Sequence, residues 1–299
     1  MEQSEKQRIV DGLRKYVARY PSQNKAAASL KGVSAATVSA ILNGNHDLIS
    51  EEMWRNVASQ TSKAIAPRNE VIIATRTFNE IQAALADAQE GGIFRWIIGS
   101  AGRGKTTGAA YYAAEHKNVF TILCSGRMTI GILLRVIACK IGVRITGMVQ
   151  YDMMEAIAAR LTQLESPLLI FDEADKLKDA PFSLFLDLYN RIEYYCGMAA
   201  LSPAVIERRI ARNIDKKEGY DEIDSRIGRR FFELAKIAPV EVASICMANG
   251  VKDDKDIAEI VDLANETNSD LRAVHREIRR RKAMAAARRA SSQKQSNNS

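Results

Sequence analysis

The stretch that decides the fold is Gly99-Ser100-Ala101-Gly102-Arg103-Gly104-Lys105-Thr106-Thr107. It matches the pattern G-x-x-x-x-G-K-[ST], in which glycines let the backbone amides turn inward around phosphate oxygens. An apolar run at 94–98 precedes it and helix-forming residues follow it, which is the order of strand, loop and helix that such a cradle requires. The sequence therefore predicts that residues 99–107 bind the phosphates of a nucleotide.

Two side chains of this stretch have specific expected roles. Lys105 is expected to reach the β- and γ-phosphates of ATP, and Thr106 is expected to offer its hydroxyl to Mg²⁺. A chance match to the pattern in a chain of 299 residues has a probability of roughly one in a hundred. We therefore expect ATP and Mg²⁺ as cofactors.

A second motif follows about 70 residues downstream, where the apolar run Leu168-Leu169-Ile170-Phe171 ends in Asp172-Glu173-Ala174-Asp175. At the carboxyl end of a strand beside the phosphate cradle, Asp172 is expected to hold the water shell of Mg²⁺. Glu173 is expected to polarise the attacking water. The alternative is a buried strand that ends in a solvated acidic turn.

The spacing of the apolar runs predicts the fold class. Further short runs lie at 119–124, at 198–201 and at about 232–237, with helical periodicity between them and at 76–88. Strands that alternate with helices indicate an α/β fold, a parallel sheet flanked by helices. The extra strand at 119–124 between the two motifs favours ATPases with a catalytic glutamate over adenylate-kinase-like and Ras-like folds.

Residues 7–62 read as a run of short helices that end before a linker candidate around Pro67. Gly32 suits a tight turn and Ser34 suits a helix N-cap, so residues 22–44 have helix-turn-helix spacing. We expect this region to bind DNA, through Lys31, Thr37 and Asn43, or else to be a bundle that binds another protein. The candidate recognition helix has no arginine for bidentate guanine contact, which disfavours strong base readout.

The formal net charge is +7, and it is concentrated near the end of the chain. Residues 272–289 contain eight Lys or Arg and a single acid, Glu277. Such a segment is typical of a polyanion partner, and the absence of an apolar stripe favours nucleic acid over membrane. The candidate DNA contacts here are Arg279, Arg280, Arg281 and Lys282. Two alternatives are a solvated helix end favoured by the helix dipole, and a DNA path on the ATPase core through residues such as Arg127.

Composition excludes other classes. Hydrophobic residues make up 46% and charged residues 26% of the chain, which is ordinary for a folded globular protein. The four cysteines form no Cys-x-x-Cys pair, which speaks against a zinc knuckle. No apolar run approaches the 18 or so residues of a membrane span, and the start MEQSEKQR lacks the apolar core of a signal peptide. We expect a cytoplasmic protein.

On the two motifs quoted above, the sequence over about residues 76–282 resembles the AAA+ family. The resemblance implies that Ser202, at the end of the fourth strand, senses the γ-phosphate, although a following Pro203 departs from the family pattern. It implies that the segment Asp224-Ser225-Arg226-Ile227-Gly228-Arg229-Arg230 presents an arginine finger to a neighbouring subunit, with Arg226 the first choice and Arg229 the second. It also implies that Arg272, in Ser269-Asp270-Leu271-Arg272, folds over the nucleotide from a helical lid.

The order of parts resembles the AAA+ ATPases of DNA transposition. It implies a helix-turn-helix domain at 1–66, an AAA+ α/β domain at 67–238, a helical lid at 239–285 and a basic, polar, disordered tail at 286–299. The implied activity is ATP-dependent, sequence-neutral binding of double-stranded DNA by a filament or ring of this chain, which delivers the DNA to a DDE transposase. Two alternatives stay open, an ATP-switched helix-turn-helix regulator and a replication helicase loader.

Overall fold

The computed structural model describes residues 3–17, 20, 22–46, 49–65 and 71–296. The chain divides into two compact units, Met1–Glu70 and Val71–Ser299, and each is described by itself. The linker that the sequence predicts around Pro67 lies outside the described residues.

The first unit is helical, and its described helices are α1 (Gln3–Val17), α2 (Gln23–Ala28), α3 (Ala35–Leu42) and α4 (Glu51–Ile65). They share one apolar core that includes the fully buried Leu13, Val38 and Trp54. The turn between α2 and α3 contains Gly32 at φ +70°, a conformation that favours glycine. Ser34 caps α3, because its hydroxyl accepts a hydrogen bond from the Thr37 amide at 3.0 Å.

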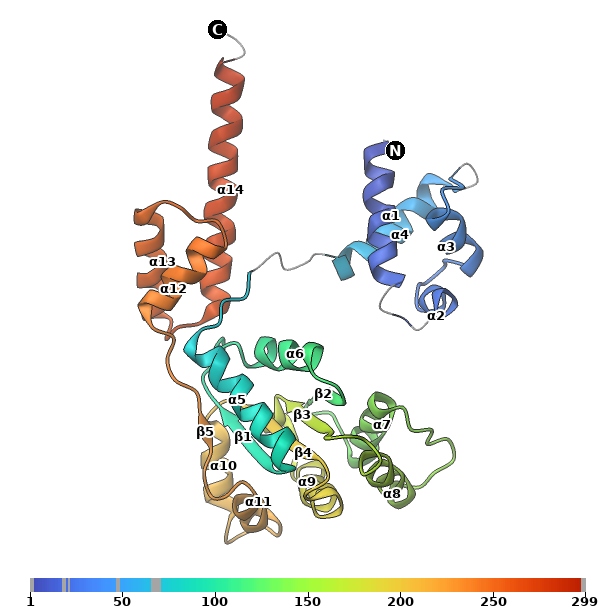
Figure 1. Cartoon of the computed structure of the whole chain (residues 1–299), viewed down its shortest axis with the longest axis vertical. Helices are drawn as coiled ribbons and strands as arrows, with labels where there is room; N and C mark the ends of the chain where they lie inside the picture. The colour runs from blue at the N-terminus through green and yellow to red at the C-terminus, as the bar shows by residue number, and fades with distance from the viewer. Residues whose placement is uncertain (1–2, 18–19, 21, 47–48, 66–70, 297–299) are drawn as a thin grey trace. The chain divides into compact units, whose positions relative to one another are not determined.

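The second unit is built on a five-stranded parallel sheet, which confirms the predicted α/β class (Figure 1). The strands are β1 (Phe94–Ile98), β2 (Val119–Leu123), β3 (Leu168–Asp172), β4 (Gly197–Ser202) and β5 (Phe232–Glu233). Their order across the sheet is β2-β3-β4-β1-β5. In the sheet, β4 therefore lies between β1 and β3, the strands that lead into the two motifs. The strand that lies between the two motifs in sequence, β2, forms one edge of the sheet.

Helices cover both faces of the sheet (Figure 1). Side chains alternate along each strand, so Ile97 packs into the core under α5 (Arg76–Gly91) and α6 (Lys105–Glu115), while Trp96 packs into the core on the other face. The helices that contribute to this other core are α7 (Ile130–Ile141), α8 (Gln150–Leu161), α9 (Asp179–Ile192), α10 (Val205–Asn213) and α11 (Tyr220–Arg226).

The fifth strand is shorter than the run at 232–237 predicts. The Leu234 amide still donates to Ile98 O at the end of β1, at 2.9 Å. At Ala235 side chains replace the neighbouring strand, since the Ala235 amide donates to Glu80 at 2.9 Å and its carbonyl accepts from Arg103 at 2.7 Å. These bonds satisfy the polar groups of the backbone and lead the chain away from the sheet.

The chain then forms a helical unit of α12 (Pro239–Ala248), α13 (Asp254–Glu266) and α14 (Leu271–Ser296), with its own core around Ile245, Ile260 and Val274. The sequence predicts a disordered tail at 286–299, but α14 continues to Ser296 (Figure 1). The difference has a physical reason, because the alanine, arginine, lysine and glutamine of this segment are strong helix formers. Within the described ranges, no helix is long and apolar enough to cross a membrane.

Candidate nucleotide site

The loop at 99–104 connects β1 to α6 and forms the predicted cradle, called the P-loop below. Gly102 and Gly104 both have φ +79°, which a side chain would strain. Gly104 is the N-cap of α6, so the amides and the positive end of the helix dipole face the loop. Gly102 and Gly104 are thus required by the backbone conformation at these two positions.

Lys105 begins α6 and turns its side chain back onto this loop. Its ammonium donates to the carbonyl of Gly99 at 2.5 Å and to the carbonyl of Ser100 at 3.0 Å. Burial lowers the pKa of Lys105, and the nearby Asp172 carboxylate opposes that effect. If a phosphate anion bound here, the Lys105 ammonium would exchange these two neutral carbonyl acceptors for negatively charged phosphate oxygens.

Thr106 and Asp172 are brought together as the two motifs predict. The Thr106 hydroxyl donates to Asp172 Oδ2 at 2.7 Å, across 66 residues of sequence. A hydroxyl and a carboxylate beside a phosphate cradle are the oxygen donors with which proteins hold Mg²⁺, which otherwise keeps water and phosphate ligands. This donor set fits the metal that the sequence predicts.

Glu173 lies directly after β3 in a left-handed conformation, at φ +57°. Its carboxylate forms an ion pair with Lys176, and both side chains are about half exposed. The expected base therefore sits at the correct end of the sheet, next to Asp172, with its charge compensated by a lysine that sequence reasoning missed.

Carboxylates gather at this end of β3. Burial raises the pKa of Asp175, and its buried Oδ1 has no hydrogen-bond partner among the described residues. Burial, reinforced by Asp172, Asp175 and Glu173, raises the pKa of the Cys124 thiol to about 12. The thiol stays protonated, and the surplus of negative charge suits a divalent cation.

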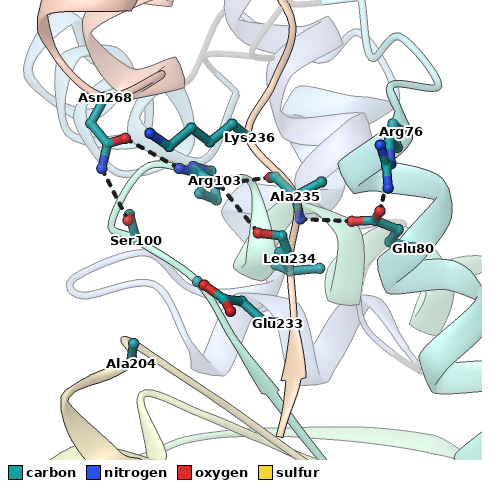
Figure 2. Close-up of a pocket in the computed structure, with 11 residues that line it drawn as sticks. Arg76, Glu80, Ser100, Arg103, Ala204, Glu233, Leu234, Ala235, Lys236 and Asn268 are labelled. Atoms are coloured by element: carbon teal, nitrogen blue, oxygen red, sulfur yellow. Dashed lines mark hydrogen bonds and ion pairs between the residues drawn. The ribbon is translucent and has the colours of Figure 1, made fainter.

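Arg103 contributes its backbone to the P-loop but not its guanidinium. The side chain is only 5% exposed and donates to the carbonyls of Leu234 and Ala235 and to Asn268 Oδ1 (Figure 2). It lines a cavity of about 450 Å³ beside the loop, together with Glu80 and Lys236. The nucleotide contact predicted for Arg103 therefore stays a prediction for its amide, because its guanidinium is engaged by Leu234, Ala235 and Asn268.

Ser202 ends β4 next to the end of β1, but its side chain is 1% exposed and its hydroxyl accepts from the Trp96 indole at 2.8 Å. That bond engages the group that the resemblance assigns to γ-phosphate sensing. Arg272, in contrast, is exposed at the start of α14 and lies close enough to Lys105 to contribute to the lowering of its pKa.

The two finger candidates differ in their surroundings. Arg226 ends α11 and is held by α9, where it donates to Asn190 at 3.0 Å and to Glu193 at 3.2 Å. Arg229 follows in a left-handed conformation, and its side chain is 69% exposed with an ion pair to Asp221 at 3.7 Å. None of these bonds joins Arg226 or Arg229 to the P-loop of its own chain.

The residues predicted to contact DNA differ in their exposure and in their bonding partners. Lys31, Asn43, Arg127 and Lys282 are exposed, and Thr37 is half-buried with its hydroxyl bonded to Ser34. Arg280 pairs with Glu277 and stays largely exposed. Arg281 is different, because its side chain is 18% exposed and its guanidinium pairs with Asp256, Glu259 and Glu277.

Comparison with protein families supports the site. Residues 90–199 match the family described as an AAA domain, a range that runs from the end of α5 into β4 and contains both motifs. A comparison with curated proteins gave no match. The family match, the parallel sheet and the P-loop geometry indicate an AAA-type P-loop ATPase domain over this range, and the general activity of that class is nucleotide hydrolysis.

Proposed function

We propose that this chain is a Mg²⁺-dependent ATPase that assembles on double-stranded DNA without sequence preference and delivers that DNA to a DDE transposase. The single observation that carries the ATPase part is the contact between Thr106 and Asp172, since it joins the two motifs at the end of the sheet where the P-loop lies. The DNA part is supported by exposed basic residues and by the order of the chain's parts.

The residues of the site divide the chemistry among themselves. The P-loop amides and Lys105 bind the phosphates, Thr106 and Asp172 hold Mg²⁺, and Arg272 approaches from α14. Glu173 orients water for attack on the γ-phosphate once its carboxylate leaves Lys176. Bound Mg²⁺ supplies charge stabilisation at the β- and γ-phosphates.

Self-assembly completes the site in this proposal. The Arg103 guanidinium is bonded to backbone carbonyls, and Arg76, which lines the cavity beside the P-loop, pairs with Glu80. An arginine supplied from another subunit is worth about 10³- to 10⁵-fold in hydrolysis rate. Arg226 is the first candidate and Arg229 the second, as the resemblance to the AAA+ family implies.

DNA binding is proposed to rest on phosphate contacts. Exposed basic residues lie on the loop after β2, at Arg127, and on α14, at Arg276, Arg279, Arg280 and Lys282. Arg281 is withdrawn from this set, since three carboxylates compensate its charge. In the first unit α3 exposes Ala35 and Ala36 and contains no arginine, which favours sequence-neutral contact over base readout.

The transposition part rests on resemblance. The helical first unit, the AAA-type domain, the helical unit α12–α14 and the basic end resemble, in that order, the transposition ATPase of phage Mu, the B protein, with IstB and TnsC as more distant relatives. We propose a helix-turn-helix role for α2 and α3 and a lid role for α12–α14 on the same ground.

The test is ATP turnover by the full chain, with and without plasmid DNA, in Mg²⁺ and after chelation by EDTA. We expect Mg²⁺-dependent hydrolysis that DNA of unrelated sequences stimulates equally. Turnover that ignores DNA, combined with a tight footprint on one palindrome, would favour the ATP-switched regulator. Preference for single strands or for a helicase would favour the loader.

A further inference from the structure

The P-loop is held from outside by two segments of the chain. One is the extended segment after β5, and the other is the turn between α13 and α14. The Arg103 guanidinium donates hydrogen bonds to Leu234 O at 3.3 Å, Ala235 O at 2.7 Å and Asn268 Oδ1 at 3.3 Å (Figure 2). These three bonds are called the Arg103 contact below. One buried side chain of the P-loop thus touches both segments.

The turn touches the loop at two further places. Asn268 Nδ2 donates to the Ser100 hydroxyl at 3.2 Å, and the Leu271 amide donates to the Gly102 carbonyl at 3.0 Å. The backbones meet so closely that a Cβ on Gly102 would lie 2.9 Å from Asp270 Cα. Gly102 is therefore needed for this approach as well as for its own φ angle.

The turn itself is conformationally costly. Asn268 and Ser269 are consecutive non-glycine residues in the left-handed region, at φ +53° and +60°. Such a conformation persists where surrounding contacts hold it. The contacts that hold this turn include those with the P-loop, the bond of the Ser269 amide to Ala264 O at 2.7 Å and the bond of the Ser269 hydroxyl to Ile237 O at 3.2 Å.

We propose that Arg103 is a positioning residue that couples the P-loop to the helical unit α12–α14, so that the two change conformation together when nucleotide binds. The proposal deepens the proposed nucleotide site and rests on it for the role of nucleotide. Its basis is that Arg103 is only 5% exposed and that its guanidinium donates to Leu234, Ala235 and Asn268, which belong to the two segments that lead into and join that unit and not to the phosphate cradle.

The chemistry favours coupling over phosphate binding. Turning the guanidinium toward the phosphates would leave the carbonyls of Leu234 and Ala235 without their donor and would break the contact to Asn268. Because α14 also carries exposed basic residues, the Arg103 contact gives occupancy of the ATP site a path to the proposed DNA-binding helix.

The test compares the full chain with Arg103→Met, Arg103→Lys and Asn268→Ala, and uses Arg160→Met, at an exposed position of α8, as the matched control. Two quantities are measured: ATP affinity, by titration with a fluorescent ATP analogue, and hydrogen exchange of backbone amides at 264–274. Exchange is measured without and with ATP, and the nucleotide-free measurement tests the contact even if ATP binding fails.

If the proposal is right, Arg103→Met and Asn268→Ala each speed nucleotide-free exchange of the Leu271 amide by roughly tenfold, whereas ATP affinity falls by less than about threefold. Arg103→Lys keeps one donor and gives a partial effect. The double variant Arg103→Met/Asn268→Ala exchanges no faster than the faster single variant, because both changes remove the same contact. The control matches wild type.

Other outcomes overturn the proposal. Loss of ATP affinity in Arg103→Met with unchanged exchange at 264–274 would make Arg103 a phosphate ligand. If Arg103→Met changes neither hydrogen exchange at 264–274 nor ATP affinity, the bonds of Arg103 do not hold the turn. If Arg103→Met fails to fold, Asn268→Ala decides by the same two readouts.

Discussion

At the scale of single residues, the two catalytic assignments separate by experiment. Lys105→Ala is expected to abolish ATP binding, because the charge on the β- and γ-phosphates loses its compensating ammonium. Glu173→Gln keeps the shape of the site and the pair of Thr106 and Asp172, so ATP should bind and persist unhydrolysed. Equilibrium binding and single-turnover hydrolysis measure the two properties, and equal loss of affinity in both variants would contradict the roles.

The role of Arg226 as an arginine finger can also be tested by single substitutions. Arg226→Ala is expected to lower DNA-stimulated turnover by about 10³-fold while ATP affinity stays within a few-fold, since the guanidinium acts on the neighbouring subunit. Mixing Arg226→Ala with Lys105→Ala subunits should restore part of the activity, because some junctions then combine an intact site with an intact arginine. Full turnover by Arg226→Ala would shift the role to the more exposed Arg229.

At the scale of elements, one polar cluster ties α9, α10 and α11 together. Asp179 accepts hydrogen bonds from Arg209 at 2.8 Å, Lys217 at 2.6 Å and Tyr220 at 2.7 Å. Arg209 also donates to the carbonyls of Asp175 and Leu177, so the cluster connects the segment after Glu173 to the helix that ends in Arg226.

This cluster predicts a pH dependence of stability. The bonds, that from Lys217 first, hold the pKa of Asp179 well below its ordinary value, so its contribution is present above about pH 4 and is lost as the carboxylate protonates at lower pH. Asp179→Asn should lower Tm at pH 7 by roughly 2–4 °C, allowing about 1 kcal/mol for a half-exposed group. Thermal melts should show this difference shrinking below pH 4; a constant difference would mean that the charge is not responsible.

The elements show what the sequence can predict. Apolar runs and glycine spacing are local signals, and they predict the two motifs and the parallel sheet. They also predict β1 with the bounds that the structure has, Phe94–Ile98. The position of β4 between β1 and β3 does not follow from them, since strand order depends on contacts between distant segments. Neither do the short β5, the side-chain direction of Arg103 or the role of Asn268, which depend on bonds across 131 residues or more.

At the scale of the whole molecule, the charge on α14 divides into structural and available parts. Arg281→Gln should leave Asp256, Glu259 and Glu277 without their shared cation and lower stability by about 2 kcal/mol, or roughly 4–8 °C in Tm. It should leave the salt dependence of DNA binding nearly unchanged.

The exposed residues should behave in the opposite way. Arg280→Gln/Lys282→Gln should keep Tm within about 2 °C and reduce the slope of log affinity against log salt by roughly 0.9 for each lost phosphate contact. Differential scanning fluorimetry and binding titrations between 50 and 200 mM salt measure the two effects. A slope that the double variant leaves intact, and that Arg127→Gln reduces, would place the DNA path on the ATPase core.

The central claim is that ATP, and not base sequence, controls DNA binding. The most direct measurement is the equilibrium affinity of the full chain for two DNA duplexes of equal length and unrelated sequence, with and without ATP and Mg²⁺, beside Lys105→Ala. We predict affinities for the two duplexes within about threefold, an increase of at least about tenfold on adding ATP, and no increase in Lys105→Ala. Tight binding to one sequence that neither ATP nor Lys105→Ala changes would contradict the account.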